Sequence, residues 1–380
     1  MAATQPFVLL VHAGAGDHGT KAYVHAMYEE MLRLACEKGH AALVADGGSP
    51  TAAVAAAIRV LENDPSCNAG RGSSLNADGK VECDASIMSG DDGSFGACAA
   101  TAGVSNPIDL AERLRRAQSE PLPGGLVNPI MLAGAGAERW ARAHGVECCD
   151  PSKHVTEQRT KQLEIYRSYT EETSTQLDDS SEAPPRKVQR REEPAEAPAQ
   201  KRIFDTVGAI CVDSTLSVAA GVSSGGLWLK DPGRIGEAAL YGAGCWAADG
   251  GAEHAGVACS VSGIGEQVTQ AQLAQRVARA LAVASADDGA HGAALAELRD
   301  GFTARMGPSH LPPTAGLVAC RAEPAGAGEP PSVELVWGHN TPSLAVGYYH
   351  HKQSAPRAII SRSDSVSVSG VCVRFGHSRG

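Results

Sequence analysis

The pair Asp205-Thr206 has the residue types that nucleophilic catalysis by a single residue requires, and it lies where a charged segment meets a strand-like apolar run. If the peptide bond between them were cut, Thr206 would carry both a hydroxyl nucleophile and a free α-amine as its base. An α-amine has a reference pKa of about 7.7–8.0, so part of it is neutral near pH 7. In an uncut chain this nitrogen is an amide and cannot accept the proton. The alternative is that Thr206 is only a β-branched residue at a strand start.

Polar residues downstream of Thr206 could complete such a site. Ser224 lies at the end of the strand predicted to return beside Thr206, so its hydroxyl could orient the nucleophile. Arg234 follows a turn and offers a planar fork that suits a carboxylate, although a surface arginine usually binds nothing. Ser262 and Gly263 could donate a hydroxyl and a backbone N–H to an oxyanion.

Three glycine-rich segments invite a phosphate-binding interpretation: HAGAG at 12–16, NAGRGSS at 68–74 and SSGG at 223–226. None has the Lys-Ser/Thr ending of a P-loop, and HAGAG lacks the third glycine of the dinucleotide fingerprint. Taken singly, each is explained by a tight turn.

The elements that must position these residues alternate between strands and helices. Apolar periodicity predicts a buried strand at 7–11 and helices at 21–45, from Pro50 to Asp64, at 269–286 and at 293–305. Ser49 is the expected N-cap of the second helix. The runs 206–213 and 216–222 flank a two-residue turn and predict an antiparallel hairpin. This mixture favours layered α+β structure over a parallel nucleotide-binding sheet.

One segment separates the chain into two blocks. Between Glu171 and Arg202, only Leu177 and Val188 are apolar and larger than alanine. Such a segment cannot bury enough surface to offset its ordering entropy. We therefore predict an ordered block over roughly 1–160, a charged flexible insert over about 161–202, and a second block that begins near Ile203. No role is assigned to residues 287–380.

Composition excludes several classes of protein. The net charge of −10 argues against a surface that binds nucleic acid directly. No window approaches the ~18 uncharged apolar residues of a membrane helix, and the first residues lack the basic start of a secretion signal. The 11 cysteines show no repeated zinc-ligand spacing, so no metal is expected.

Several motifs in order resemble the asparaginase type 2 family of N-terminal-nucleophile hydrolases. They are HAGAG, the run from SPTAAVAAAIRVLENDPSCNAGRGSSLNADGK to VECDASIMSG, DTVGAICVD, SSGG, DPGRIGEAALYGAGCW and SGIGE. The resemblance spans most of residues 7–268. Within the family, the chain is most similar to the threonine aspartase (taspase) branch. The similarity lies in the segments SSGGLWLKDPGR and ECDASIM and in the long charged insert.

This resemblance implies an αββα four-layer sandwich that cleaves itself between Asp205 and Thr206. The products would be an α subunit, 1–205, and a β subunit, 206–380, which form one catalytic domain. The family pattern implies that Thr206 is the nucleophile. The same pattern implies that Ser224 supports the nucleophile and that Asn68 helps to orient or stabilise the reacting centre. It further implies that Ser262 and Gly263 form the oxyanion hole and that Arg234 binds a substrate carboxylate.

Glu237 departs from the family pattern and leaves the substrate open. Family enzymes that act on free amino-acid derivatives usually carry Asp there, to hold the α-ammonium, whereas taspases carry Gln. The junction Phe204-Asp205 resembles the hydrophobic-then-Asp sites that taspases cut in proteins. We therefore expect a threonine endopeptidase that cleaves after Asp. The alternatives are a small-molecule asparaginase or isoaspartyl peptidase, and an uncleaved nuclear scaffold.

The resemblance also bears on partners and location. Association of αβ units, as a heterodimer or (αβ)2, is expected, and the mechanism needs no cofactor. The basic clusters Arg186–Arg191 and Lys201–Arg202 resemble a bipartite nuclear import signal, although a solvated linker explains them equally well. By analogy the substrates would be nuclear regulatory proteins, and the expected location is the nucleus and cytoplasm.

Overall fold

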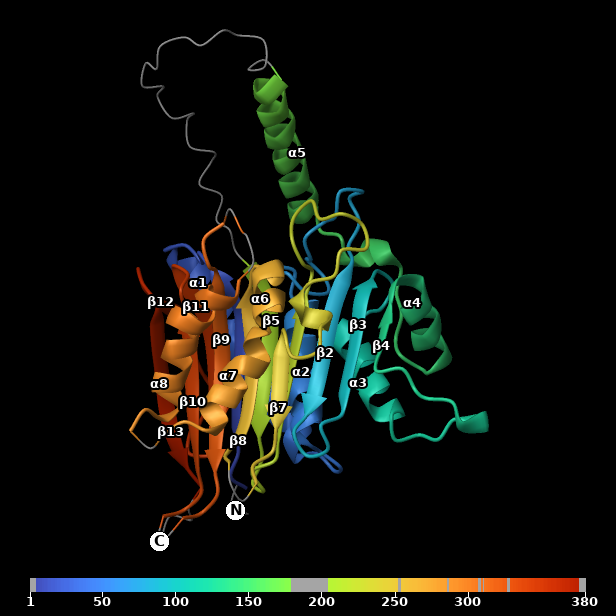
Figure 1. The fold of residues 1–380 in the computed structure, drawn as a ribbon. Coiled ribbons are helices and arrows are strands. Elements are labelled where there is room, and N and C mark those ends of the chain that lie inside the picture. The colour runs from blue at the N-terminus through green and yellow to red at the C-terminus, as the bar shows by residue number, and fades with distance from the viewer. Residues whose placement is uncertain are drawn as a thin grey trace.

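The computed structural model describes residues 5–178, 204–251, 254–285, 287–306, 309, 311–326 and 329–375. Two sheets lie face to face between two layers of helices (Figure 1). The eight-stranded sheet has the order β12-β11-β1-β5-β6-β2-β3-β4, and the five-stranded sheet has the order β13-β10-β9-β8-β7. The α+β sandwich expected from the resemblance is therefore present, whereas self-cleavage stays a prediction.

The strands are β1 (Val8–Gly16), β2 (Cys83–Ser89), β3 (Phe95–Thr101), β4 (Met131–Ala133), β5 (Phe204–Val212), β6 (Val218–Ser224), β7 (Cys245–Ala248), β8 (Gly256–Gly263), β9 (Ala315–Glu323), β10 (Ser332–His339), β11 (Ser343–His350), β12 (Arg357–Arg362) and β13 (Ser367–Arg374). The α-helices are α1 (Ala22–Val44), α2 (Pro50–Asn63), α3 (Pro107–Ala117), α4 (Gly134–Ala143), α5 (Glu157–Asp178), α6 (Gly265–Ala271), α7 (Leu273–Ala282) and α8 (Gly289–Ala296).

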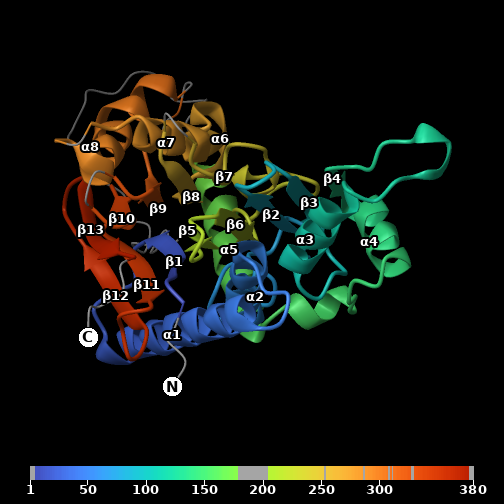
Figure 2. The ribbon, with the colours of Figure 1, turned by 90° about the horizontal axis from the view of Figure 1, so that it is seen from below.

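Strand β1 shows how the sequence builds the layers. Its residues alternate between two cores: Leu9 and Val11 pack towards the helices, while Val8 and Leu10 pack between the sheets. A strand buried on both faces has a continuous apolar run, as Phe7 to Val11 has. Viewed from below, α1 and α2 line one side of the strands and α6, α7 and α8 line the other (Figure 2).

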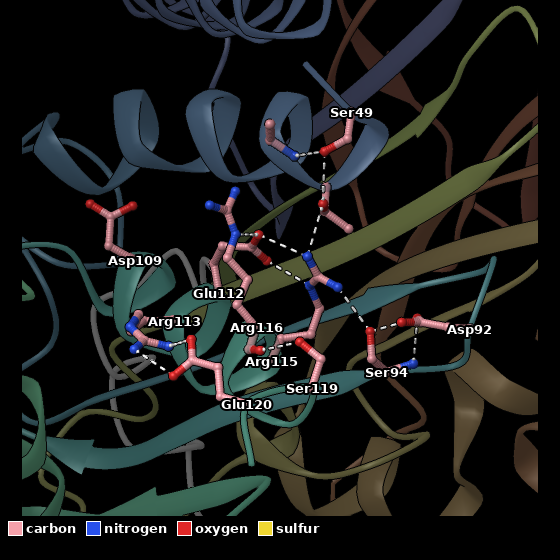
Figure 3. Close-up of polar contacts among 12 residues, drawn as sticks. Ser49, Asp92, Ser94, Asp109, Glu112, Arg113, Arg115, Arg116, Ser119 and Glu120 are labelled. Carbon is pink, nitrogen blue, oxygen red and sulfur yellow. Dashed lines mark hydrogen bonds and ion pairs between the residues drawn. The ribbon is translucent and has the colours of Figure 1, made fainter. Parts of the chain in front are cut away.

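Helix α2 begins as the sequence predicts. Ser49 Oγ accepts a hydrogen bond from Ala52 N at 3.2 Å, and Pro50 occupies the first helical position. On the neighbouring helix α3, Arg115 donates to Glu112 and also to Ser94 Oγ of the β2–β3 connection at 2.8 Å (Figure 3). The bond to Ser94 ties α3 to the large sheet, and Arg115 Nη2 also donates to Thr51 Oγ1 of α2 at 3.3 Å, so α2 and α3 are linked to each other.

The structure corrects three expectations about the elements. The helix predicted over 269–286 is two helices, α6 and α7, because Gln272 adopts a left-handed conformation with φ of 48°. The helix predicted over 293–305 is α8 followed by short irregular turns. The hairpin turn is longer than the predicted two residues, because β5 ends at Val212 and β6 begins at Val218. The unassigned region 287–380 contributes α8 and five strands.

The charged insert does not begin where the sequence predicted. Helix α5 runs from Glu157 to Asp178 and projects beyond the layers (green in Figure 1). The first half of α5 contains Leu163, Ile165 and Tyr166, and contacts of Arg159 and Leu163 with residues 67–83 anchor it. This half is therefore helical despite its charge. The basic clusters Arg186–Arg191 and Lys201–Arg202 lie outside the described residues, so the import signal stays a prediction. Among the described residues, no helix is long and apolar enough to span a bilayer.

Candidate functional site

The β5–β6 hairpin brings the candidate nucleophile to its expected partner. Val207 pairs with Ser223, and the next residue along each strand is Thr206 or Ser224. Thr206 Oγ1 lies 3.0 Å from Ser224 Oγ, and both side chains are buried. Strand alternation turns both hydroxyls towards the second sheet, and the antiparallel hairpin predicted from the sequence brings the two strands together. The Asp205 side chain lies outside the described part of the chain.

Glu237 is the second partner of the nucleophile. The Thr206 hydroxyl is within 3.0 Å of Glu237 Oε1, to which it donates. Burial raises the pKa of Glu237, while the positive charge of Arg234 opposes that rise. A Cβ at Gly265 would lie 2.5 Å from both Glu237 Oε2 and Arg234 Nη2, so only glycine fits between these two groups. The side chain of Glu237 is longer than the Asp that is usual at this position in the family, and it contacts the nucleophile itself.

Arg234 is held in place and keeps one nitrogen for a ligand. Its Nε and Nη2 donate to the two carboxylate oxygens of Glu266, each at 2.9 Å. Its Nη1 is buried and has no hydrogen-bond partner among the residues that the structure describes. Burial alone would lower the pKa of Arg234, but the hydrogen bond to Glu266 raises it, so the guanidinium stays charged. A buried donor without a partner suits a carboxylate ligand.

Asn68 shapes the loop beside the nucleophile. Its Nδ2 donates to Gly226 O at 2.8 Å, and its Oδ1 accepts from Ser74 N at 2.7 Å. The backbone of Asn68 also accepts from Gly225 N at 2.7 Å. Asn68 thus lies at the site, as expected, and its contacts hold the SSGG loop.

The expected oxyanion residues lie at the end of β8. Gly263 lines the cavity that contains Thr206. Ser262 is completely buried, and its Oγ accepts a hydrogen bond from Ala15 N at 3.2 Å. Ala15 belongs to the HAGAG segment at 12–16, which forms the end of β1. His12 of the same segment forms a hydrogen bond with Ser260 Oγ through its Nε2 at 2.9 Å. A role of Ser262 and Gly263 towards an oxyanion stays a prediction.

These residues surround one cavity of about 210 Å³. Six of the predicted site residues line it: Asn68, Thr206, Ser224, Arg234, Glu237 and Gly263. Ser262, the neighbour of Gly263 in the chain, is not part of this lining. The rest of the lining is mostly apolar and was not predicted from the sequence: Tyr166, Gly226, Leu227, Trp228, Gly265 and Leu311. Tyr166 lies in the segment predicted to be a flexible insert, so no sequence signal pointed to it.

A buried charge pair supports the loop that carries Arg234. Asp84 Oδ2 accepts from Gly236 N at 2.7 Å, and Lys230 Nζ donates to Gly225 O at 2.8 Å. Burial raises the pKa of Asp84 and lowers that of Lys230, while each charge opposes the shift of the other. Asp84 lies in the motif ECDASIM, and Lys230 lies in SSGGLWLK. A charged residue within an apolar run is the sequence signal that could have identified both of them.

The arrangement suits acyl transfer at a bond flanked by a carboxylate. It holds a hydroxyl nucleophile, a carboxyl group beside it and a guanidinium in the same cavity. Among the described residues, no three His, Cys, Asp or Glu side chains lie close enough together to hold a metal ion.

One protein-family model and several known proteins match this chain. A family model described as "Asparaginase" matches residues 5–320. The chain is 33% identical over 268 residues to the isoaspartyl peptidase/L-asparaginase of Bos taurus, covering 70% of this chain and 74% of that protein. It is 32% identical over 344 residues to the plant-type L-asparaginase of Pyrobaculum calidifontis, covering 90% and 96%. It is 34% identical over 275 residues to the isoaspartyl peptidase of Escherichia coli, covering 71% and 75%.

Proposed function

The chain belongs to the asparaginase type 2 family of N-terminal-nucleophile hydrolases, and from this premise we propose that it is a self-activating threonine hydrolase of aspartyl amide bonds. The observation that carries the proposal is the buried Thr206 hydroxyl, 3.0 Å from both Ser224 and Glu237, in the same cavity as the free nitrogen of Arg234.

The proposed activation begins in the uncut chain, because β5 runs through the Asp205–Thr206 bond. Thr206 Oγ attacks the Asp205 carbonyl carbon, the C–N bond breaks, and the nitrogen takes up a proton. Water then hydrolyses the resulting ester, which leaves a carboxylate on Asp205 and a free α-amine on Thr206. This amine is the base that the uncut chain lacks.

In the proposed catalytic cycle, the Thr206 amine takes the proton of Oγ as Oγ attacks the substrate carbonyl. Ser262 and Gly263 donate to the oxyanion, and Arg234 binds the carboxylate of the aspartyl group. The leaving amine takes the proton back, and water releases the acyl group by the same steps.

The names of the similar proteins favour small substrates for this chain. The relatives named above carry the names isoaspartyl peptidase and L-asparaginase. A β-aspartyl dipeptide or asparagine would present its α-carboxylate to Arg234 and its α-ammonium to the acidic side chain of Glu237. These substrates are the first candidates for this chain.

A second candidate is endopeptidase activity after Asp, which a specific observation favours. Four apolar side chains line the cavity next to the polar groups, and free asparagine has no group to cover them: Tyr166, Leu227, Trp228 and Leu311. A peptide would place its Asp side chain on Arg234. The proposed self-cleavage is itself a cut after Asp.

Two experiments test the proposal. On a denaturing gel, the purified chain should convert from a 39.1 kDa band to two fragments, the smaller beginning with Thr206. The Thr206→Ala variant should stay intact, while Thr215→Ala, a change in the exposed β5–β6 turn, should cleave normally. An intact wild-type band would support a scaffold instead, and cleavage of Thr206→Ala would exclude Thr206 as nucleophile. Turnover of asparagine, a β-aspartyl dipeptide and a Phe-Asp-Gly peptide then ranks the substrates.

A further inference from the structure

The first self-cleavage of the chain needs a proton acceptor other than the Thr206 amine. In the uncut chain the nitrogen of Thr206 belongs to an amide within β5, so it cannot take the proton of its own hydroxyl. A hydroxyl is a weak nucleophile until a neighbouring group removes its proton. Some other group in the folded chain must therefore accept this proton.

The hydrogen bonds around Thr206 give its hydroxyl proton one direction. Gly226 N donates to Ser224 Oγ at 3.0 Å, and Ser224 Oγ lies 3.0 Å from Thr206 Oγ1. Thr206 Oγ1 in turn donates to Glu237 Oε1 at 3.0 Å. Because a hydroxyl has a single proton, Ser224 donates to Thr206 when Thr206 donates to Glu237. The series of donors therefore ends on the carboxyl group of Glu237.

Three other ionisable groups near Thr206 are less suited to accept its proton. Arg234 stays charged and has no lone pair to offer. The two carboxyl oxygens of Asp84 each accept a hydrogen bond from a backbone N–H, at 2.8 Å and 2.7 Å. On the neighbouring strand β1, burial lowers the pKa of His12 to about 3, so its ring is a weak base near neutral pH. Among the described residues, Glu237 is the acid that contacts the Thr206 hydroxyl.

The surroundings of Glu237 make its carboxylate a stronger base than that of an exposed glutamate. The residue is 2% exposed, and burial raises its pKa. The positive charge of Arg234 opposes that rise, whereas the negative charge of Asp84 on β2 adds to it. Lys230 is paired with Asp84, and Glu266 of α6 is paired with Arg234, while β3 and β6 carry no charged side chain. A carboxylate with a raised pKa accepts a proton more readily than an ordinary one.

We propose that the Glu237 carboxylate is the general base of the first self-cleavage. It takes the proton of Thr206 Oγ as Oγ attacks the carbonyl carbon of Asp205. The C–N bond then breaks, and the carboxyl group of Glu237 gives the same proton to the Thr206 nitrogen, which leaves as an amine. Glu237 is thereby restored as a carboxylate, and water hydrolyses the remaining ester. This inference rests on the proposed function and adds to it a base that acts once, because the new amine is the base in every later turnover.

The length and the fixed position of the Glu237 side chain make this role possible. Glu237 begins a short helical turn, Glu237–Ala239, in which Leu240 N donates to Glu237 O at 3.0 Å. Gly265 leaves room for the carboxyl group, since a Cβ there would lie 2.5 Å from Glu237 Oε2. An Asp at this position would be one methylene shorter, and a Gln would have no carboxylate. A chain with either residue would need another acceptor, such as water.

The test follows freshly synthesised chain, made in a cell-free extract, as the 39.1 kDa band converts to two fragments at a series of pH values. The wild-type rate should rise with pH, because only the ionised carboxylate accepts the proton, and should level off once Glu237 is ionised. Glu237→Gln should cleave about 100-fold or more slowly, without this rise. Glu237→Asp should also be slow but keep the rise. Glu30→Gln, the same change on the exposed face of α1, should match the wild type.

Turnover by the cleaved enzyme distinguishes a base from a structural support. Chains of Glu237→Gln or Glu237→Asp that have cleaved after long incubation should lose far less in the hydrolysis of end-blocked aspartyl peptides than in self-cleavage, because the Thr206 amine then accepts the proton. Equal losses in the two reactions would mean that Glu237 only shapes the site, and would overturn the proposal.

Two further outcomes would also overturn it. One is self-cleavage of Glu237→Gln within about threefold of the wild-type rate. The other is a rise with pH that survives in Glu237→Gln and disappears in Asp205→Asn, since the acceptor would then be Asp205 itself. If Glu237→Gln fails to fold, the rate of Glu237→Asp decides, and a wild-type rate there refutes the role. A wild-type chain that never cleaves would instead refute the proposed function.

Discussion

Replacing Arg234 by Lys tests whether Arg234 binds the carboxylate of the substrate. The guanidinium donates twice to Glu266 at 2.9 Å and keeps Nη1 for a ligand. Lysine retains the positive charge but has a single ammonium on a flexible stem. That group cannot make the paired contact with Glu266 and also reach a substrate carboxylate in the same geometry.

The expected loss follows from one charge-assisted hydrogen bond. Such a bond contributes about 1.5–3 kcal/mol, and about 1.4 kcal/mol corresponds to a factor of ten. Arg234→Lys should therefore lower kcat/KM about 10- to 150-fold. Because the carboxylate is bound equally in the ground state and the transition state, the loss should appear mainly in KM. The fold should be retained, since the positive charge beside Glu266 remains.

Steady-state kinetics with an aspartyl substrate measure this effect, and N-terminal sequencing confirms that the variant is cleaved. Glu266→Gln is the matched control, because it leaves Arg234 in the cavity but loosens its hold, and we expect a loss of less than about tenfold since Glu266 is half exposed. An unchanged KM in Arg234→Lys would refute the assignment of Arg234 as the carboxylate ligand. A loss confined to kcat would point to Arg234 acting on the reacting bond.

Three further predictions concern neighbouring groups. Glu237→Gln should lower kcat/KM about 10- to 150-fold for substrates with an α-ammonium and less than about threefold for end-blocked peptides, and equal losses would contradict a role in holding ammonium. Burial raises the pKa of Glu62 from 4.5 to about 8, so the folded chain keeps a proton that the unfolded chain releases, and stability should fall as pH rises through this window. In Glu62→Gln, thermal unfolding should show a weaker fall of Tm between these pH values, whereas an unchanged pH dependence would contradict the buried acid. A Cβ in Gly208→Ala would overlap Ser260 Oγ, so the free energy of unfolding should drop by about 1–3 kcal/mol. In Gly136→Ala the new Cβ would meet only the end of the Arg139 side chain, at 3.9 Å, so this control should not destabilise the chain.

The sequence by itself determined the local elements that carry the nucleophile. Apolar runs on both sides of a turn indicated the β5–β6 hairpin, which brings the end of β6 beside Thr206. The register that places Thr206 against Ser224 depends on the longer turn at 213–217, which the sequence did not indicate. Ser49 and Pro50 fixed the start of α2. These features depend on residues close in sequence, for which period and capping are sufficient signals.

The order of the motifs also predicts that Arg234, Glu237, Asn68 and Gly263 belong to one site, and all four line the cavity with Thr206. What the motifs could not supply was how these residues are held. The bidentate contact of Arg234 with Glu266 and the hydrogen bond from Thr206 to Glu237 depend on side-chain directions set by packing.

Only the tertiary structure decided that α5 belongs to the site. The charged residues 171–202 led to the prediction that the chain is flexible from about 161. The first half of α5 does contain apolar residues, and it is held by a few long-range contacts, from Arg159 to the backbone of 67–72, from Leu163 to the cluster around Leu75, and from Tyr166 to Trp228. Neither segment carries a signal that says which distant residues it contacts, so the contact of Tyr166 with Trp228 could be found only in the folded chain.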